Sequence, residues 1–274
     1  MPMRLEGRSV LLTGATGGIG GAIAHELAAR GCALTVTGRR TAELARLVTE
    51  LGPPARGSAA DLTNLTEVRE LVDHADPVDI LVACAGVDIP QDLADASDEA
   101  IEEAMRVNLV APAALARAAL APMKERGAGH IVFIGSVAGL VATPINSSVY
   151  TATKWGLRGL ALVLRQELHG TGIGVSTVFP AGVRDAGMFA RTGITLPWYA
   201  GTSSPQEVAR AVVRAVERDR PEVVVASGGE RLGAAISGVA PVLVGRLARM
   251  TGLGRIRQAV LEARSRGDGP VAGR

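Results

Sequence analysis

The sequence predicts an α/β fold, a doubly wound parallel sheet of about seven strands with helices on both faces. Three observations support this class. Short aliphatic runs recur through the first 180 residues. These runs are apolar throughout and do not alternate with polar residues, as expected for strands that are buried on both faces. Longer stretches with helical periodicity separate them, which favours parallel strands joined by helical crossovers.

The elements are expected in a regular order along the chain. Strands are predicted at residues 9–13, 33–37, 79–83, 130–134, 174–179 and 222–226. A Gly-rich turn separates the first strand from a helix over residues 19–30, and another helix follows over 41–51. A later helix has Ser204 as its cap, Pro205 at its first position and Glu207 completing a capping box. Residues 184–203 show little periodicity, and an irregular segment of this length is more often functional than idle.

The chain is expected to form one Rossmann-type domain over residues 1–230, a helical extension over 231–266 and a disordered tail over 267–274. No charged residue occurs between Arg231 and Arg246, and Pro241 interrupts this apolar stretch, which is too short to span a bilayer. Two interpretations of the extension stay open. It is a core, lid or subunit-contact helix, or it is a basic amphipathic segment resting on a membrane surface.

Composition excludes several functional classes. Hydrophobic residues make up 47 % of the 274 residues and aromatic residues 3 %, so an aliphatic core is expected. A net charge of +2 gives no basis for nucleic-acid binding. Cys32 and Cys84 are predicted to be free, buried thiols, and the four histidines lack metal-ligand spacing. The first strand begins within ten residues of Met1, which leaves no room for a signal peptide and favours a cytoplasmic setting.

A glycine-rich loop follows the first strand and opens the first helix. Gly14 permits a tight turn, while Gly18 and Gly20 let the backbone approach a pyrophosphate at the helix N-terminus. The second strand ends at Arg39 and Arg40, where an NAD-selective site would place an acidic residue. Arginine suits a ribose 2′-phosphate. We therefore expect NADP as the cofactor, with NAD the less favoured alternative.

A tyrosine and a lysine share one helix face four residues apart. The chain has two lysines against 27 arginines, and one of them, Lys154, follows Tyr150 at this spacing. A compact ammonium next to a phenol favours the phenolate and lowers its pKa. Tyr150 is therefore predicted to exchange a proton with a substrate oxygen, to which Ser136 could also hydrogen-bond.

Together these residues resemble the short-chain dehydrogenase/reductase family, in its short-subunit branch, over roughly residues 7–226. The loop matches TGxxxGxG from Thr13 to Gly20, and a catalytic tetrad matches at Asn108, Ser136, Tyr150 and Lys154. The resemblance implies that Asn108 holds a water in a proton relay and that Lys154 also binds the nicotinamide ribose. It further implies a homodimer or homotetramer joined largely through helices over 108–124 and 150–167. The residues expected to bind the cofactor are Gly14, Thr16, Gly18, Ile19, Gly20, Arg39, Arg40, Asp61, Leu62, Ala85, Gly86, Asn108, Tyr150, Lys154, Pro180, Gly182 and Val183.

Three positions depart from the family pattern. The usual Asn-Asn-Ala-Gly is replaced by Ala83-Cys84-Ala85-Gly86, which loses two amides that brace the sheet. After the sixth strand, Ala181 replaces a glycine, and Asp185 stands where a threonine often binds the nicotinamide carboxamide. Gly17 replaces a basic residue that some NADP-binding members carry. The expected contact after the sixth strand is therefore the Val183 backbone, and Arg39 is expected to carry most of the NADP selectivity.

The expected activity is NADP(H)-dependent interconversion of a ketone or aldehyde and an alcohol by hydride transfer. Apolar residues within 137–148 and 184–203 suggest a hydrophobic substrate. The alternative is a non-catalytic dinucleotide-binding regulator on the same fold, since a fold alone does not fix a function. Retention of all four tetrad residues favours the enzyme.

Overall fold

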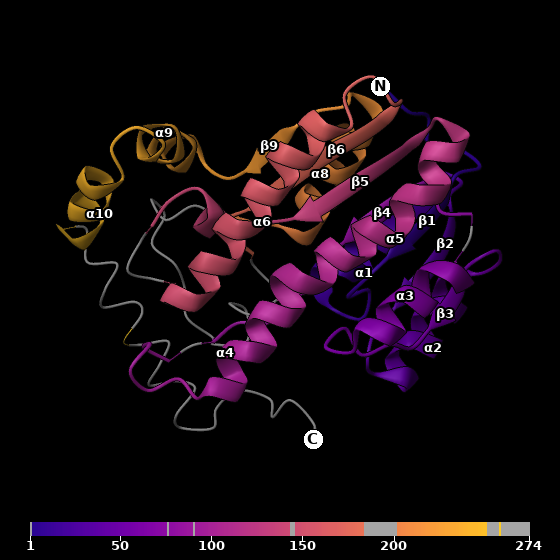
Figure 1. Cartoon of the computed structure of the whole chain (residues 1–274), viewed down its shortest axis with the longest axis horizontal. Coiled ribbons are helices and arrows are strands. Elements are labelled where there is room, and N and C mark those ends of the chain that lie inside the picture. Colours follow the sequence, from indigo (N-terminus) through magenta and orange to yellow (C-terminus); the bar gives the residue numbers. More distant parts are fainter. Residues whose placement is uncertain are drawn as a thin grey trace.

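The computed structural model describes residues 2–75, 77–89, 91–142, 146–183, 202–250 and 258. A seven-stranded parallel sheet forms its centre, in the order β3-β2-β1-β4-β5-β6-β9 (Figure 1). The strands are β1 (Ser9–Leu12), β2 (Ala33–Thr37), β3 (Arg56–Ser58), β4 (Ile80–Ala83), β5 (Gly129–Ile134), β6 (Ile173–Pro180) and β9 (Glu222–Val225). The predicted fold class is confirmed.

Helices connect the strands and continue beyond the sheet. Those that precede the last sheet strand are α1 (Gly18–Ala28), α2 (Thr41–Leu51), α3 (Leu65–His74), α4 (Asp98–Met105), α5 (Ala111–Arg126), α6 (Ser148–Glu167) and α8 (Pro205–Glu217). A π-helical turn, η1 (Arg106–Val110), joins α4 to α5, and a 3-10 turn, η2 (Val137–Gly139), follows β5. The helices α9 (Gly228–Ser237) and α10 (Pro241–Met250) come after β9.

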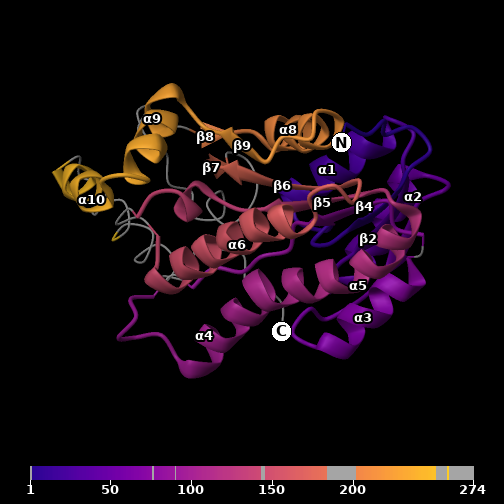
Figure 2. The ribbon, with the colours of Figure 1, turned by 45° about the horizontal axis from the view of Figure 1, so that its top comes forward.

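The two faces of the sheet have separate apolar cores. Val10 and Leu12 of β1 pack toward α1, α2 and α8, whereas Leu11 packs toward α3, α5 and α6. All three side chains are buried, because successive side chains of a strand point to opposite faces and helices cover both. This explains why the strands appear in the sequence as continuous apolar runs. Figure 2 shows the sheet between these two helical layers.

Most predicted boundaries agree with the structure. The predicted limits of β2 and α2 are those observed, and Ser204 and Glu207 form the predicted capping box at the start of α8. The sequence did not predict the short strand β3, nor a two-stranded parallel sheet that pairs β7 (Gly182–Val183) with β8 (Thr202–Ser203). This pairing joins the two ends of the segment expected to be irregular.

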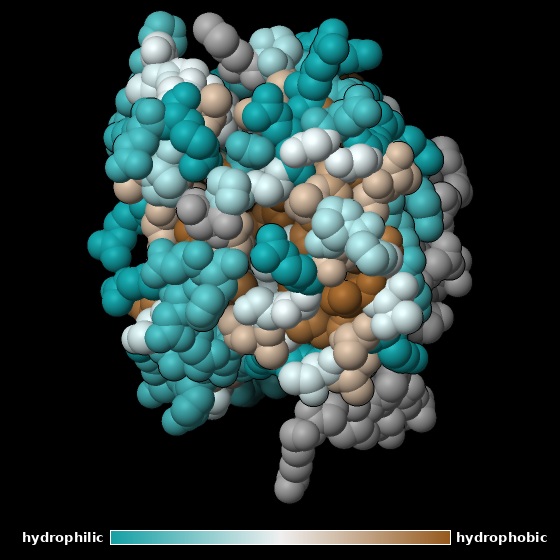
Figure 3. Space-filling view, turned by 90° about the vertical axis from the view of Figure 1, so that its right-hand side faces the viewer, coloured by the Kyte–Doolittle hydropathy of each residue, from teal (hydrophilic) through white to brown (hydrophobic). Residues whose placement is uncertain are grey.

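The helical run from Asp98 to Arg126 is long and apolar enough to cross a membrane, and no other helix among the described residues is. Its inner side packs in the core, where Leu115, Ala119 and Met123 are fully buried. A core helix passes the same test of length and composition. At the end of the molecule that carries β2 and β3, the surface is mainly hydrophilic, and apolar residues show in a recess near its centre (Figure 3).

Candidate active site

The glycine loop between β1 and α1 has no room for side chains. Gly14 has a φ of +68°, and a Cβ added there would lie 2.7 Å from the Cα of Ala85, on the loop after β4. A Cβ at Gly20 would overlap the Gly14 carbonyl. Gly17 caps α1 without a side-chain hydrogen bond, and the first turn of α1 has no acidic residue. The loop therefore presents backbone at the positive end of a helix dipole, which suits a pyrophosphate group.

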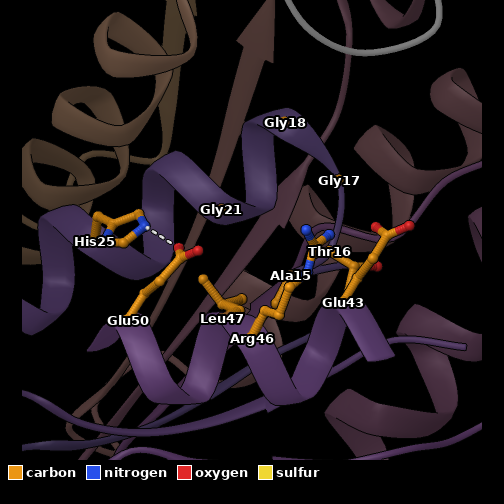
Figure 4. A pocket seen from close by; sticks show the side chains of 10 residues that line it. All are labelled: Ala15, Thr16, Gly17, Gly18, Gly21, His25, Glu43, Arg46, Leu47 and Glu50. Atoms are coloured by element: carbon orange, nitrogen blue, oxygen red, sulfur yellow. Dashed lines mark ion pairs between the residues drawn. The ribbon is translucent and has the colours of Figure 1, made fainter. Parts of the chain in front are cut away.

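A groove of about 240 Å³ lies beside this loop, between α1 and α2 (Figure 4). Its wall includes Ala15, Thr16, Gly17 and Gly18, and Arg46 extends from α2 toward Thr16. Arg46 was not singled out from the sequence, because one arginine among 27 in a helix gives no signal of its own. Arg46 therefore places a positive charge next to the glycine loop, where Gly17 has no side chain to provide one.

The two arginines after β2 are held in different ways. Arg40 donates a hydrogen bond to the carbonyl of Thr16 at 2.7 Å and pairs with Glu43 at 2.7 Å, so it ties β2 to the glycine loop. Arg39 is 60 % exposed and meets Glu103 at 3.4 Å. A guanidinium in so loose a pair is the one better able to reorient toward a ligand phosphate. The structure thus supports Arg39 as the candidate phosphate ligand and gives Arg40 a role in shaping the loop.

The loop after β4 is braced by Thr13 in place of the two missing amides. Thr13 is buried, and its Oγ1 accepts hydrogen bonds from the backbone N–H groups of Cys84, at 3.1 Å, and Ala85, at 3.2 Å. This holds β1 and β4 at the point where the strand order of the sheet reverses, which is where dinucleotides bind in such folds.

The adenine-side residues follow β3. Asp61 accepts a hydrogen bond from the backbone N–H of Thr63 at 2.9 Å, which shapes the turn into α3, and Leu62 is buried. Glu67 accepts one from the backbone N–H of Asp61 at 2.8 Å. The Asp61 carboxylate is therefore fixed in position at the carboxyl end of β3.

Asn108 lies in the π-helical turn η1 and is completely buried. Its Oδ1 accepts from the backbone N–H of Val87, and its Nδ2 donates to the Val87 carbonyl, both at 2.8 Å. Nδ2 also donates to Oγ1 of Thr153 at 3.2 Å. The side-chain amide is thus fully used in joining the loop after β4 to α6. The π-helical turn widens the helix locally, as is common at functional sites.

Tyr150 and Lys154 lie on the buried face of α6, four residues apart as predicted. Ser147 caps this helix by accepting a hydrogen bond from the backbone N–H of Tyr150 at 3.1 Å. Lys154 Nζ donates to the carbonyl of Ile134 at 3.1 Å and lies 5.6 Å from the centroid of the Tyr150 ring. The cap sets the first turn of α6, and the lysine anchors the helix to the end of β5.

Ser136 joins this pair from the adjacent strand end. Ser136 acts on the Tyr150 hydroxyl by lowering its pKa, and its Oγ accepts a hydrogen bond from the backbone N–H of Ala138 at 3.1 Å. Gly86 lies opposite: a Cβ there would be 3.3 Å from Asn108 Oδ1 and 3.7 Å from Lys154 Nζ. The four predicted catalytic residues are therefore brought together at the carboxyl edge of the sheet.

Burial dominates the ionisation of the reactive pair. It raises the pKa of the Tyr150 hydroxyl above its usual 10, although the hydrogen bond with Ser136 acts in the opposite direction, and the carboxylate of Asp88 adds to the rise. Burial also lowers the pKa of Lys154 to about 8, which Cys84 opposes. The expected lowering of the Tyr150 pKa is not found in this structure, because burial disfavours the phenolate more than the interaction with Ser136 favours it.

The residues after β6 approach the same edge. Pro180 ends β6, and Gly182 and Val183 form β7, where Val183 is buried. Ala181 is buried and donates its backbone N–H to the carbonyl of Val225 at 2.9 Å, so the alanine at this glycine position is accommodated next to β9. Asp185 and the predicted substrate residues among 184–201 lie outside the described residues.

Comparisons with known proteins agree with this geometry. A family model described as short chain dehydrogenase matches residues 8–195. The chain belongs to the short-chain dehydrogenase/reductase family. It is 36 % identical to ketoacyl reductase HetN of Nostoc sp., over 98 % of this chain and 97 % of that protein. It is also 28 % identical to 3-ketodihydrosphingosine reductase of Bos taurus, over 88 % of this chain and 78 % of that protein.

A solved short-chain dehydrogenase from Sphingobium yanoikuyae, in complex with NADPH, is similar to the structure with a TM-score of 0.75 and 30 % identity. The similarity covers 86 % of this chain and 94 % of that one. The family assignment made from the glycine loop and the tetrad is thereby confirmed. Thr13, Asp88 and Thr153 are site residues that were not among the predicted ones. Thr13 opens the family motif and Thr153 lies on the buried face of α6, so both had a signal in the sequence, while Asp88 had none.

Proposed function

We propose that this chain reduces a ketone on an apolar compound with NADPH, using Tyr150 as the proton donor. The observation that carries the proposal is the convergence of Ser136, Tyr150 and Lys154 at the sheet edge next to the glycine loop. A non-catalytic binding protein would have no use for a buried phenol paired with a serine hydroxyl and a buried ammonium. Burying these polar groups costs free energy that a role in catalysis would justify.

The ionisation of the site is compatible with ketone reduction. A tyrosine whose pKa lies above 10 stays protonated at neutral pH and can donate a proton to a ketone oxygen. NADPH, when bound, supplies the hydride. Ser136 orients the same oxygen, and Lys154 stabilises the phenolate that remains after proton transfer. Asn108 keeps the loop after β4 aligned with α6 and is a positioning residue.

The cofactor proposal rests on the charges around the glycine loop. Arg39 and Arg40 follow β2, where an NAD-selective site would place an acidic residue, and Arg46 lines the groove beside the loop together with Glu43 and Glu50. A ribose 2′-phosphate suits the two arginines after β2. The NADPH-bound Sphingobium enzyme, at 30 % identity, supports the same choice. Gly14 and Gly20 allow the loop to pack closely against Ala85 and against itself, which holds its backbone in the shape that we propose for pyrophosphate binding.

The substrate class rests on two further observations. The names of HetN and of the bovine enzyme describe reduction of a ketoacyl compound and of 3-ketodihydrosphingosine, both ketones. Leu140 follows η2, four residues after Ser136, and is buried, so apolar packing lies close along the chain to the site. A ketone carried on an acyl chain suits such a site.

The chain is also proposed to form a homodimer or homotetramer through α5 and α6. Trp155, Leu162 and Val163 are exposed on α6, on the side away from the sheet. Exposed apolar side chains two turns apart on one helix favour contact with a second copy. Sedimentation analysis of the Leu162→Asp variant tests this assembly.

Replacement of Tyr150 by Phe tests the catalytic role. We expect ketone-dependent oxidation of NADPH, measured with a series of 3-oxoacyl thioesters and aliphatic ketones, to fall by about 100- to 10,000-fold. NADPH binding, measured by fluorescence titration, should change little, because the substitution removes only the phenol hydroxyl and leaves the glycine loop intact. Undiminished turnover by this variant would contradict the proposal, and loss of NADPH binding would show that the substitution disturbed the fold.

Replacement of Arg39 by Ala tests the cofactor preference. A lost charge-assisted hydrogen bond to a phosphate should weaken NADPH binding by about 10- to 100-fold. NADH binding to the same variant is the internal control and should stay unchanged, since NADH has no 2′-phosphate. Equal losses for both nucleotides, or tighter binding of NADH by the unmodified chain, would show that Arg39 does not select the cofactor.

A further inference from the structure

The helices α9 and α10 both expose several apolar side chains. On α9 and the turn after it, Leu232, Ala235, Ile236 and Val239 are exposed and recur at helical spacing, so they lie along one stripe. Val239 is 89 % exposed. On α10, Leu243, Leu247 and Met250 form a similar stripe, while the buried Ala248 faces the protein. We call these two stripes the α9–α10 surface. A single exposed aliphatic residue needs no explanation, but exposed apolar stripes on two consecutive helices indicate a binding surface.

Basic residues border this surface. Arg246 and Arg249 are exposed on α10 and flank its apolar stripe, and neither forms a hydrogen bond or ion pair with any residue that the structure describes. Residues 231–266 contain seven arginines and one acidic residue, a net charge of +6, whereas the whole chain carries +2. The remaining residues therefore carry a net charge of −4. The positive charge is therefore concentrated in this C-terminal part of the sequence, and Arg246 and Arg249 place part of it beside the exposed apolar side chains of α10.

The surface lies at the same edge of the sheet as the active site. The helix α9 follows the carboxyl end of β9, and α10 approaches the loop after η2: a Cβ at Gly245 would lie 3.8 Å from the carbonyl of Ala142. Figures 1 and 2 both show α9 and α10 projecting beyond the strands at this end. A partner bound there would thus sit beside the substrate side of the site.

We propose that the α9–α10 surface rests on an anionic lipid surface. Aliphatic stripes bordered by arginines match the apolar interior and the negative headgroups of such a surface, and each helix is too short to span it. A second copy of the chain fits less well, because two segments of net charge +6 would repel each other. The proposal is independent of the proposed reaction, since it uses no catalytic residue.

Co-sedimentation with vesicles tests the charge part of the proposal. The full chain should bind vesicles made of a three-to-one mixture of phosphatidylcholine and phosphatidylserine, and should bind pure phosphatidylcholine only weakly. Added salt should weaken the binding. The double variant Arg246→Gln/Arg249→Gln should bind the mixed vesicles roughly 30-fold less tightly. The matched control is Arg210→Gln/Arg214→Gln on the exposed side of α8, which removes the same charge elsewhere and should bind like the unmodified chain.

A leucine substitution tests the apolar part. Leu243→Ser should weaken binding to the mixed vesicles by roughly tenfold, since the side chain no longer enters the acyl region. Leu93→Ser is the control, because Leu93 is similarly exposed, 59 % against 52 % for Leu243, but lies outside this surface. Thermal melting followed by circular dichroism should show that all variants stay folded.

Three results would overturn the proposal. The first is that the unmodified chain fails to bind the mixed vesicles. The second is that Arg246→Gln/Arg249→Gln and its α8 control weaken binding equally, which would show an unspecific charge effect. The third is that Leu243→Ser dissociates an oligomer formed in the absence of lipid, which would show that a second copy covers the surface. NADPH turnover in solution should be the same for all these variants, so a failure of the proposed reaction is distinguishable from a failure of lipid binding.

Discussion

At the scale of single residues, Thr153 shows how the parts of the site are held in position relative to each other. It lies one residue before Lys154 and is completely buried. Its Oγ1 donates to the Tyr150 carbonyl at 2.7 Å and accepts from Asn108 Nδ2 at 3.2 Å. One hydroxyl therefore joins the helix that carries the reactive pair to the turn that holds the loop after β4. The threonine has no part in the chemistry, but it fixes how Tyr150 faces that loop.

Replacement of Thr153 by Val keeps the shape of the side chain and removes this link. An Asn108 N–H is then left buried without a partner, so the free energy of unfolding should fall by about 1–3 kcal/mol, measured by urea denaturation. The turnover rate should also fall, while the pH profile keeps its form. Thr49→Val on α2 is the matched control, because Thr49 is exposed and bonds only to the carbonyl of Ala45 at 3.0 Å. Equal losses in the two variants would contradict the proposed role.

At the scale of elements, α6 is fixed at both ends. Its N-terminal half is held by the Ser147 cap and by the bond from Lys154 to Ile134. In its C-terminal half, Arg158 pairs with Glu222 of β9 at 2.7 Å, and Arg165 pairs with Asp219, in the turn before β9, at 2.8 Å. Because β9 lies at the edge of the sheet, these pairs hold the edge strand against the catalytic helix.

The Arg165–Asp219 pair predicts a pH dependence of stability. Burial alone would raise the pKa of Asp219, but hydrogen bonds and the charge of Arg165 outweigh it and lower the pKa from 3.8 to about 2. The unfolded chain therefore binds the proton more readily. The pair contributes its full stabilisation above the unfolded pKa near 4 and loses it as the pH falls toward 2.

Asp219→Asn tests this contribution. Asn tolerates the positive φ of 48° at this position, so the backbone should not change. We expect the variant to be less stable by about 2 kcal/mol at pH 7, and the difference from the unmodified chain to shrink as the pH falls from 4 to 2. Urea denaturation at several pH values measures it. A difference that does not depend on pH would show that the carboxylate charge is not what stabilises the turn.

At the scale of the whole molecule, the sequence predicted the strands and helices better than it predicted the surroundings of individual side chains. The bounds of β2 and α2 and the first residue of α8 were predicted correctly. Strand burial and helix capping both depend on residues that are close together in the sequence, so they can be recognised there. The strand β3 was not located, since Arg56-Gly57-Ser58 has no apolar run and is held by its pairing with β2. The Tyr150 pKa was misjudged because spacing reveals a neighbouring charge but not the surrounding desolvation.

The cofactor is expected to stabilise the entire chain, because its predicted site joins the ends of β1, β2, β4, β5 and β6. At a hundredfold excess over its dissociation constant, NADPH should add about 2.7 kcal/mol to the free energy of unfolding, which corresponds to a rise in Tm of about 5–10 °C. Scanning calorimetry with and without NADPH measures this rise. NADH at the same concentration should give a smaller one.

Two glycine substitutions on the same loop and helix separate cofactor binding from fold stability. Gly14→Ala places a Cβ 2.7 Å from the Ala85 backbone at a φ of +68°, so it should lower the Tm without cofactor and abolish the rise with NADPH. At Gly21, a Cβ would lie 3.5 Å from the Ala15 carbonyl, an ordinary contact between α1 and the glycine loop. Gly21→Ala should therefore raise the Tm slightly, through its helix propensity, and keep the NADPH effect. A full NADPH effect in Gly14→Ala would show that NADPH binding does not depend on the shape of this loop, because that substitution pushes the loop away from Ala85.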